Sequence, residues 1–507
     1  MSHFNASLFS SVLAVSLSGT TAFADLAPRD VWGDWRAYLE GMGYAVTATE
    51  ATNGDTLNIS DITVQIAGGP DVETMILRLP PLQFAELSGG RVEVVMSETM
   101  PLEVEITPKS TKRLAKAQLT YTQSGHSMIA SGDPDAIVFD YTADAFNLSL
   151  GSLSVDGTVF DPATTRFSLG GTALQSQTQV TAGEVRSYDQ NMQMGQVTYD
   201  IFFKDPAQVE TMMMKSTLEE VVFAGTSVLP VQEIAQAQNL APLIAAGFAF
   251  DGTFSTKATE TQTEITSDEG ASKFKTGSQN TQLAVAMGAD GVSYDVTTQQ
   301  VQVGAQLAGI PFPLFVEMAS AGMKIKAPVM KSDAPQDIAV GFDLTDFTMS
   351  DIIWALFDPS AQLPRDPATI ALDLTGKAKV LLDVFDLQQA ADAKVPAELN
   401  ALSIDRLVVD AVGAKLEAQG AATFDNTDKT TLPGFPKPVG DITVNLAGAN
   451  GLMDKLVAMG LLPAQQVTGA RMMMGLFAVP GDAPDTLTSK IEFNEAGQIL
   501  ANGQRVK

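Results

Sequence analysis

The chain has 507 residues, of which 45% are hydrophobic, an ordinary fraction for a globular protein of about three domains. Its formal net charge of −28 disfavours nucleic acid and anionic lipid surfaces as partners, because like charges repel at long range. The absence of cysteine excludes disulfides, thiolate nucleophiles, cysteine-ligated zinc and iron–sulfur clusters.

The first 24 residues have the pattern of a secretory signal peptide. The apolar run Leu8–Leu17 precedes Ala22-Phe23-Ala24, an A-x-A cleavage pattern, and Asp25 follows. This run is too short to span a bilayer, and no later segment has about 18 apolar residues without a charge. We therefore expect a mature protein that is periplasmic or secreted and that has no integral membrane segment.

After this segment the hydrophobic pattern predicts one short helix and then many strands. The helix is expected over Asp30–Gly43. From there to about residue 203, apolar residues alternate with Thr, Ser, Gln, Asp and Gly, as in antiparallel strands with one wet face. The alternation slips at Ser60-Asp61, which predicts a β-bulge or a corner.

The middle of the chain predicts a change from strands to helices and back. Ala207–Gly225 and Val231–Ala246 are expected to be helical, the first with Met212–Met214 on its apolar side. Strands resume at Phe248. Ser255–Ser278 is polar at most positions and predicts a long exposed hairpin or a mobile loop.

The last stretch, Gly440–Lys507, predicts a strand, two helices and a hairpin. Asn450 can cap the first helix, and Gly460 ends it. The second helix is expected over Pro463–Phe477. Leu487–Phe493 begins the closing hairpin, whose last signal is an Asn-Gly pair.

These elements divide the chain into three parts. Residues 1–24 are the expected signal peptide. Residues 25–247 form an N-terminal β-rich half with helices near 207–246, and residues 248–507 form a C-terminal β-rich half that ends in the helix pair and hairpin.

An internal duplication of the two halves is a further hypothesis. Each half carries a methionine triplet, Met212–Met214 and Met472–Met474. A duplication predicts that residues 195–225 and 440–477 have the same structure, a strand followed by a helix.

No catalytic or metal-binding motif is present. His126 is the one histidine after the expected signal peptide, so no two-histidine metal motif can form, and we expect His126 in an exposed loop. There is no nucleophile elbow and no phosphate-binding glycine loop. Asp133, Asp135 and Asp425–Asp428 resemble fragments of a calcium loop but are more typical of turns. We predict no catalytic, cofactor-binding or metal-binding residue, and no cofactor.

The end of the chain resembles the alphaproteobacterial family known as domain of unknown function 2125. The segments that carry the resemblance are Ala449–Leu456, Gly460–Pro463, Met472–Met474, Phe493–Ile499 and Asn502–Gln504. The resemblance implies an exported protein and supplies no site residues. The repeated hairpins also resemble AsmA-like envelope proteins, which use long curved sheets as hydrophobic grooves, although this chain lacks their membrane anchor.

The fold expected from these patterns is β-dominated α+β, with long curved antiparallel sheets and amphipathic helices packed on one face. The expected function is non-enzymatic: a periplasmic envelope protein that binds an apolar ligand, such as lipid, or a protein partner through a groove of the sheet. The 21 methionines fit either an ordinary core or such an adaptable apolar surface. One alternative is an envelope glycan hydrolase with two carboxylates facing each other across a polar cleft. Another is a structural or assembly protein.

Overall fold

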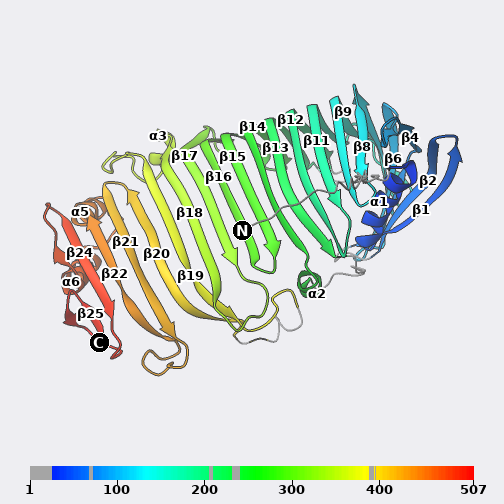
Figure 1. Ribbon diagram of the computed structural model, residues 1–507. Coiled ribbons are helices and arrows are strands. Elements are labelled where there is room, and N and C mark those ends of the chain that lie inside the picture. The colour runs from blue at the N-terminus through cyan, green and yellow to red at the C-terminus, as the bar shows by residue number, and fades with distance from the viewer. Residues whose placement is uncertain (1–24, 68–71, 205–208, 231–239, 387–392, 394) are drawn as a thin grey trace, which may run out of the picture.

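A computed structural model of the chain describes residues 25–507 except 68–71, 205–208, 231–239, 387–392 and 394. Strands make up 64% of the structure and helices 10%, and the 26 described strands form one antiparallel sheet. Figure 1 shows this sheet running the length of the molecule. The predicted β-dominated α+β class is confirmed. The predicted signal peptide, 1–24, lies outside the described residues.

The described elements, in chain order, are α1 (Pro28–Gly41), β1 (Ala45–Asn53), β2 (Thr56–Ala67), β3 (Val72–Leu79), β4 (Leu82–Leu87), β5 (Arg91–Val95), β6 (Thr99–Pro108), β7 (Ala115–Ser124), β8 (Ser127–Asp133), β9 (Ala136–Val155), β10 (Thr158–Val159), β11 (Thr165–Thr181), β12 (Val185–Lys204), β13 (Thr211–Pro230), α2 (Ala241–Ala245), β14 (Ala249–Ser267), β15 (Gly270–Gly288), β16 (Gly291–Gln306), β17 (Leu314–Ala327), β18 (Gln336–Met349), α3 (Asp351–Trp354), β19 (Ala368–Val380), β20 (Ala397–Ala411), β21 (Ala414–Asp425), β22 (Lys437–Ala447), α5 (Ala449–Ala458), α6 (Ala464–Phe477), β23 (Val479–Pro480), β24 (Thr486–Phe493), β25 (Ile499–Ala501) and β26 (Gln504–Arg505).

The N-terminal strands close on themselves. Pairings run from β2 through β3, β6, β7, β9, β8, β5 and β4 and return to β2. Two long strands make this possible, because β2 and β9 each pair with different neighbours along their lengths. The predicted slip in β2 is confirmed: Asp61 has a φ of 52°, and the pairing with β1 shifts register between Thr47 and Thr49.

The main hydrophobic core lies inside this closed end. Ile59, Phe84 and Val92 are fully buried there. Helix α1 completes the core with two tryptophans, because the rings of Trp32 and Trp35 lie 6.1 and 5.5 Å from the ring of Phe84. The ring of Trp35 packs edge-to-face on Phe84 and the ring of Trp32 is tilted against it, so aromatic contacts join α1 to this end of the sheet.

Helix α1 also reaches the start of the long part of the sheet. Its Asp34 forms a buried ion pair with Arg186 of β12, and the rings of Tyr38 and Tyr188 lie 5.3 Å apart. A buried ion pair holds its two elements in one register, because separating the charges would leave each unpaired in a dry site. The beginning of the sheet is therefore covered by a helix that is fixed in place.

From β11 to β22 the sheet is a simple meander. Each strand pairs with the next one in the chain, and the strands are 11 to 20 residues long. Figure 1 shows the strands side by side in colour order from cyan to orange. After β22, the helices α5 and α6 intervene before β24 pairs with β22.

The structure corrects the prediction of a helix over Ala207–Gly225, since the described part of this segment is strand β13. Its alternation changes phase at Glu220, whose φ is 50°. Apolar residues three apart, Leu218 and Val221, then imitate helical spacing. Of the second predicted helix, residues 231–239 lie outside the described residues.

Two other expectations for the middle of the chain are confirmed in part. The short helix α2 has Pro242 in its first turn, where proline is tolerated. The polar segment Ser255–Ser278 is the hairpin of β14 and β15, as one of the two alternatives predicted, and not a mobile loop. Residues 195–204 and 211–225 lie in two paired strands, β12 and β13, so these described residues lack the strand-then-helix form that the duplication hypothesis requires.

Candidate functional site

The alternation of residues gives the long part of the sheet one face without charge. In an antiparallel pair, directly opposed residues point to the same side of the sheet. Following these pairs from β13 to β24 through the described residues, one side carries no Asp, Glu, Lys or Arg. We call this side the uncharged face and the other the charged face.

A single row of opposed residues illustrates the continuity of the uncharged face. From β12 to β24 this row consists of Met192, Phe223, Phe254, Leu283, Val296, Met323, Phe342, Leu372, Leu407, Ala418, Val444 and Ser489. At about 4.8 Å per strand, the row is about 50 Å long.

Bulges keep the uncharged face continuous where the alternation changes phase. Non-glycine residues with a φ near 50° occur once in each of several strands of the meander: Ala173, Glu220, Asn280, Gln300 and Asp346. Where the alternation of apolar residues slips by one position, a bulge takes up the extra residue. The apolar side chains before and after the bulge then point to the same side of the sheet. Thus both halves of each bulged strand present their apolar residues to the same side.

The middle of the uncharged face is open to solvent. Four residues on β17 and β18 form two opposed pairs, Met323 with Phe342 and Ile325 with Val340. Their exposed fractions lie between 41% and 48%, and Ile370 on β19 is 42% exposed. Adjacent exposed apolar side chains of this size differ from the scattered ones that any surface has. They form a patch, which we call the open patch.

The charged face of the same strands is laced with ion pairs. Arg406 lies 3.3 Å from Asp343, and Lys377 lies 2.5 Å from Asp337. The Lys377 side chain lowers the pKa of Asp337 by hydrogen bonding and by its charge. The two faces of one sheet therefore differ sharply in chemistry, although they share the same strands.

A pocket lies on the uncharged face near the C-terminal end of the sheet. Its volume is about 600 Å³. Strands β20, β21, β22 and β24 form its floor, and the loop between β21 and β22 forms a wall. Its main lining residues are Leu399, Leu402, Ile404, Ala422, Phe424, Asn426, Lys429, Leu432, Phe435, Ile442 and Phe493. We call it the C-terminal pocket.

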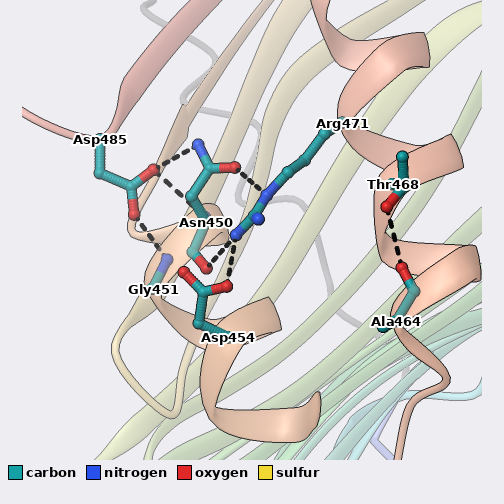
Figure 2. Close-up of polar contacts among 7 residues, drawn as sticks. All are labelled: Asn450, Gly451, Asp454, Ala464, Thr468, Arg471 and Asp485. Carbon is teal, nitrogen blue, oxygen red and sulfur yellow. Dashed lines mark hydrogen bonds and ion pairs between the residues drawn. The ribbon is translucent and has the colours of Figure 1, made fainter.

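A polar cluster fixes α5 at this end (Figure 2). The Asp485 carboxylate accepts hydrogen bonds from the backbone N–H groups of Asn450 and Gly451, at 3.1 and 2.9 Å. Arg471 of α6 donates to Asn450 Oδ1 at 2.9 Å and to Asp454 at 2.7 Å. Burial alone would raise the pKa of Asp485, but these hydrogen bonds together lower it. The cluster ties both helices to the loop before β24.

This cluster also shows the role of residues that carry the family resemblance. Asn450 was expected to cap α5, but the helix is capped from outside by Asp485, and Gly448 occupies the N-cap position. Helix α5 packs against β21, where Ala418 of the uncharged face is buried. Asn450, Gly451 and Asp454 therefore have a structural role: they hold a covering helix over the end of the sheet.

The residues considered for chemistry in the sequence lie apart. His126 is half-buried rather than exposed, and its Nε2 lies 3.0 Å from the Met96 carbonyl oxygen. Asp425 and Asp428 each accept hydrogen bonds from threonines of their own loop, as turn residues do. Within the described residues, no group of three or more His, Asp or Glu side chains is placed to hold a metal ion.

No described helix is long and apolar enough to cross a membrane.

The signal that the sequence offered for the uncharged face was the alternation itself, including Val340 and Phe342. Sequence reasoning missed Met323 and Ile325, because the alternation in β17 changes phase between Met318 and Ala321, at the level of Gln300 in β16. It also missed the C-terminal pocket, whose wall comes from a loop.

Comparison with known proteins identifies a family. A family model described as "Uncharacterized protein conserved in bacteria (DUF2125)" matches residues 249–502, half of the chain. These residues include the open patch, the C-terminal pocket and the cluster around Asp485. No curated protein and no solved structure matches the chain.

Proposed function

Since the chain belongs to the family of uncharacterized proteins conserved in bacteria (DUF2125), we propose its function from its surface. It is a non-enzymatic binding protein that holds acyl chains of lipids against the uncharged face. The observation that carries the proposal is the combination of an unbroken uncharged face with an open patch at its centre.

The length of the face suits hydrocarbon chains. A row of about 50 Å exceeds the hydrocarbon depth of one bilayer leaflet, about 15 Å. Each covered square ångström of apolar surface contributes about 25 cal/mol to binding. An acyl chain lying across the strands would cover side chains such as Met323 and Phe342, which water now contacts.

The same face is less suited to a protein partner. A partner's peptide groups lose hydrogen bonds to water on docking and need new ones. The open patch consists of hydrocarbon and thioether side chains, and the backbone groups beneath it are used in pairing with neighbouring strands. A hydrocarbon chain loses no hydrogen bonds there, so it is the occupant that the surface favours.

The carboxyl groups with shifted pKa values do not suit the acid of a glycan hydrolase. Each described carboxyl group with a clearly shifted pKa has that pKa lowered, as in Glu105, Asp358 and Asp428. The acid of a glycan hydrolase needs a raised pKa to be protonated near neutral pH. The lowered pKa values keep these carboxyl groups ionised near neutral pH, where they can accept hydrogen bonds and help keep the protein soluble.

Export to the periplasm is part of the proposal and rests on the sequence. The apolar run Leu8–Leu17 and the Ala22-Phe23-Ala24 pattern support it. A protein that presents acyl-binding surface in an envelope compartment would meet lipid there.

The proposal is tested by introducing a charge into the open patch. Val340→Glu places a carboxylate on the uncharged face at a residue that is 48% exposed, so folding should be retained. Val222→Glu is the matched control, because Val222 is 37% exposed and lies on the charged face of β13. Each full-length variant is purified from bacteria, and its bound lipid is extracted and measured by mass spectrometry.

We expect lipid to co-purify with the unmodified protein and with Val222→Glu. Val340→Glu should retain at least fivefold less, since a buried carboxylate next to hydrocarbon is strongly unfavourable. An unmodified protein without lipid, or equal retention by both variants, would refute the proposal.

A further inference from the structure

We propose that the C-terminal pocket takes one acyl chain of an anionic amphiphile and that Lys429 binds its charged head. This inference rests on the proposed function and adds a discrete site with a defined ligand class. It is carried by the pocket's shape, by the ordered loop that forms its wall and by the position of Lys429.

The floor of the pocket suits a hydrocarbon chain. Leu402 of β20, Ala422 of β21 and Ile442 of β22 come from three neighbouring strands and lie on the uncharged face. A volume of about 600 Å³ falls within the range of small-molecule sites. The open patch has no wall, whereas this pocket is enclosed on one side by the loop, so it can hold a single chain in one place.

The wall of the pocket is preformed. Asp425 accepts hydrogen bonds from the N–H and hydroxyl groups of Thr427, at 2.9 and 2.6 Å. Asp428 does the same for Thr431, at 3.0 and 2.7 Å. Asn426 Nδ2 donates to the Leu399 carbonyl oxygen at 2.7 Å and so joins the loop to β20. Little conformational entropy would be lost when a ligand enters such a loop.

Phe435 extends this wall into solvent. It is 71% exposed although it lines the pocket, and its backbone N–H donates to the Leu432 carbonyl oxygen at 2.9 Å. An exposed aromatic ring at a pocket rim is costly unless something covers it. An acyl chain in the pocket would lie against this ring.

Lys429 supplies the one cation among the described residues that line the pocket. It is exposed and makes no ion pair with any described residue, whereas many lysines on the charged face are paired. The carboxylates of Asp425 and Asp428 are close in sequence but are hydrogen-bonded within the loop. Glu398 also lines the pocket, and the strand pairing opposes it to Lys379 on the charged face.

The net charge of −28 does not prevent an anion from binding at Lys429. Salt screens charges beyond about 8 Å at physiological ionic strength, so the nearest cation dominates. Carboxylate and phosphate heads both accept hydrogen bonds from a lysine ammonium group. Anionic head and acyl chain together define the ligand class.

The test compares three probes with the same sixteen-carbon chain (about the length that a leaflet accommodates): palmitate, hexadecyl phosphate and hexadecanol. Binding to the full chain is measured by calorimetry. Lys429→Met removes the cation and keeps the length of the side chain. Lys455→Met, on α5, is the control, since Lys455 is also a lysine without an ion pair to a described residue. Ala422→Phe fills the pocket.

We expect both anionic probes to bind about tenfold more tightly than hexadecanol. Lys429→Met should remove this difference, Lys455→Met should keep it, and Ala422→Phe should remove the site for all three probes. Inorganic phosphate alone should not compete. The inference would be overturned by equal affinity for the three probes or by competition from inorganic phosphate. It would also be overturned if Lys429→Met kept the preference for the anionic probes.

The two proposals fail separately. If Val340→Glu retains as much lipid as Val222→Glu while Lys429→Met loses its preference for anionic probes, the open patch is excluded and the pocket is supported. If Val340→Glu loses lipid while Lys429→Met keeps the preference for anionic probes, the open patch is supported and the anionic site at the pocket is excluded.

Discussion

Asp485 fixes the first turn of a helix to which it does not belong. Its carboxylate accepts hydrogen bonds from the N–H groups of Asn450 and Gly451, which have no partner within α5. The sequence predicted the helix and its end, but assigned the cap to Asn450, the nearest suitable residue. A cap that comes from 35 residues further along the chain cannot be recognised from local spacing.

We predict that Asp485→Ala lowers the free energy of unfolding by about 1 to 2 kcal/mol, the usual cost of losing a helix cap. The α5 amide of Gly451 should then exchange with deuterium faster. Asp482→Ala is the control, since Asp482 is exposed in the same turn. Equal protection in the two variants would contradict this role.

The lowered pKa of Asp485 gives this cap a pH dependence. A carboxylate whose pKa is lower in the folded state stabilises the protein above its ordinary value of 3.8, and the contribution is lost as the pH falls through the lowered value. Amide protection of α5 should therefore decline below about pH 4. Asp485→Ala should lack this step, and a variant that retains it would point to another group.

At the scale of elements, the bulges decide what the sequence can reveal. Strands with clean alternation, such as the one containing Val340 and Phe342, were predicted correctly. Strand β13 was predicted as a helix, because one inserted residue at Glu220 changed the spacing of its apolar residues. Local patterns show the period of a strand. They do not show where along a strand a bulge lies relative to the neighbouring strands.

We predict that valine is unfavourable at a bulge, although it is favoured in ordinary strands. Ala173 has a φ of 51°, where a β-branched side chain is strained. Ala173→Val should therefore lower the free energy of unfolding by about 1 to 2 kcal/mol. Ala173→Gly should be nearly neutral, since relief of strain offsets the greater freedom of glycine in the unfolded chain.

The matched position for this prediction is Ala286, which lies in a regular paired region of β15. Ala286→Val should be neutral or stabilising when unfolding is followed in urea. If Ala173→Val and Ala286→Val have the same effect, the bulge does not impose the strain that we assign to it.

At the scale of the whole molecule, the sequence predicted the class of fold and one apolar face. It did not predict a single sheet or the open patch, because these depend on which strands pair and where helices lie. The closed N-terminal end is a clear case: β2 and β9 each change partners along their length, and no local signal marks this change. Likewise, residues 211–225 were predicted as part of a helix, but they form a strand of the sheet itself.

Export is a prediction about the whole chain. Protein recovered from the periplasmic fraction should begin at Asp25, as shown by N-terminal sequencing. Ala24→Arg should block processing, because the cleavage site requires small residues. Asp25→Asn, one residue later, should still be processed. Recovery of the unprocessed protein from the cytoplasmic fraction alone would refute export.

The meander from β11 to β22 has a consequence for how the chain acquires its structure. Each of these strands finds its partner in the next stretch of sequence, so most loops that must close are short. A nascent chain whose first 160 or so residues have already formed the closed end can therefore lengthen its sheet one strand at a time. Growth of this kind proceeds in one direction, from the first residues made to the last.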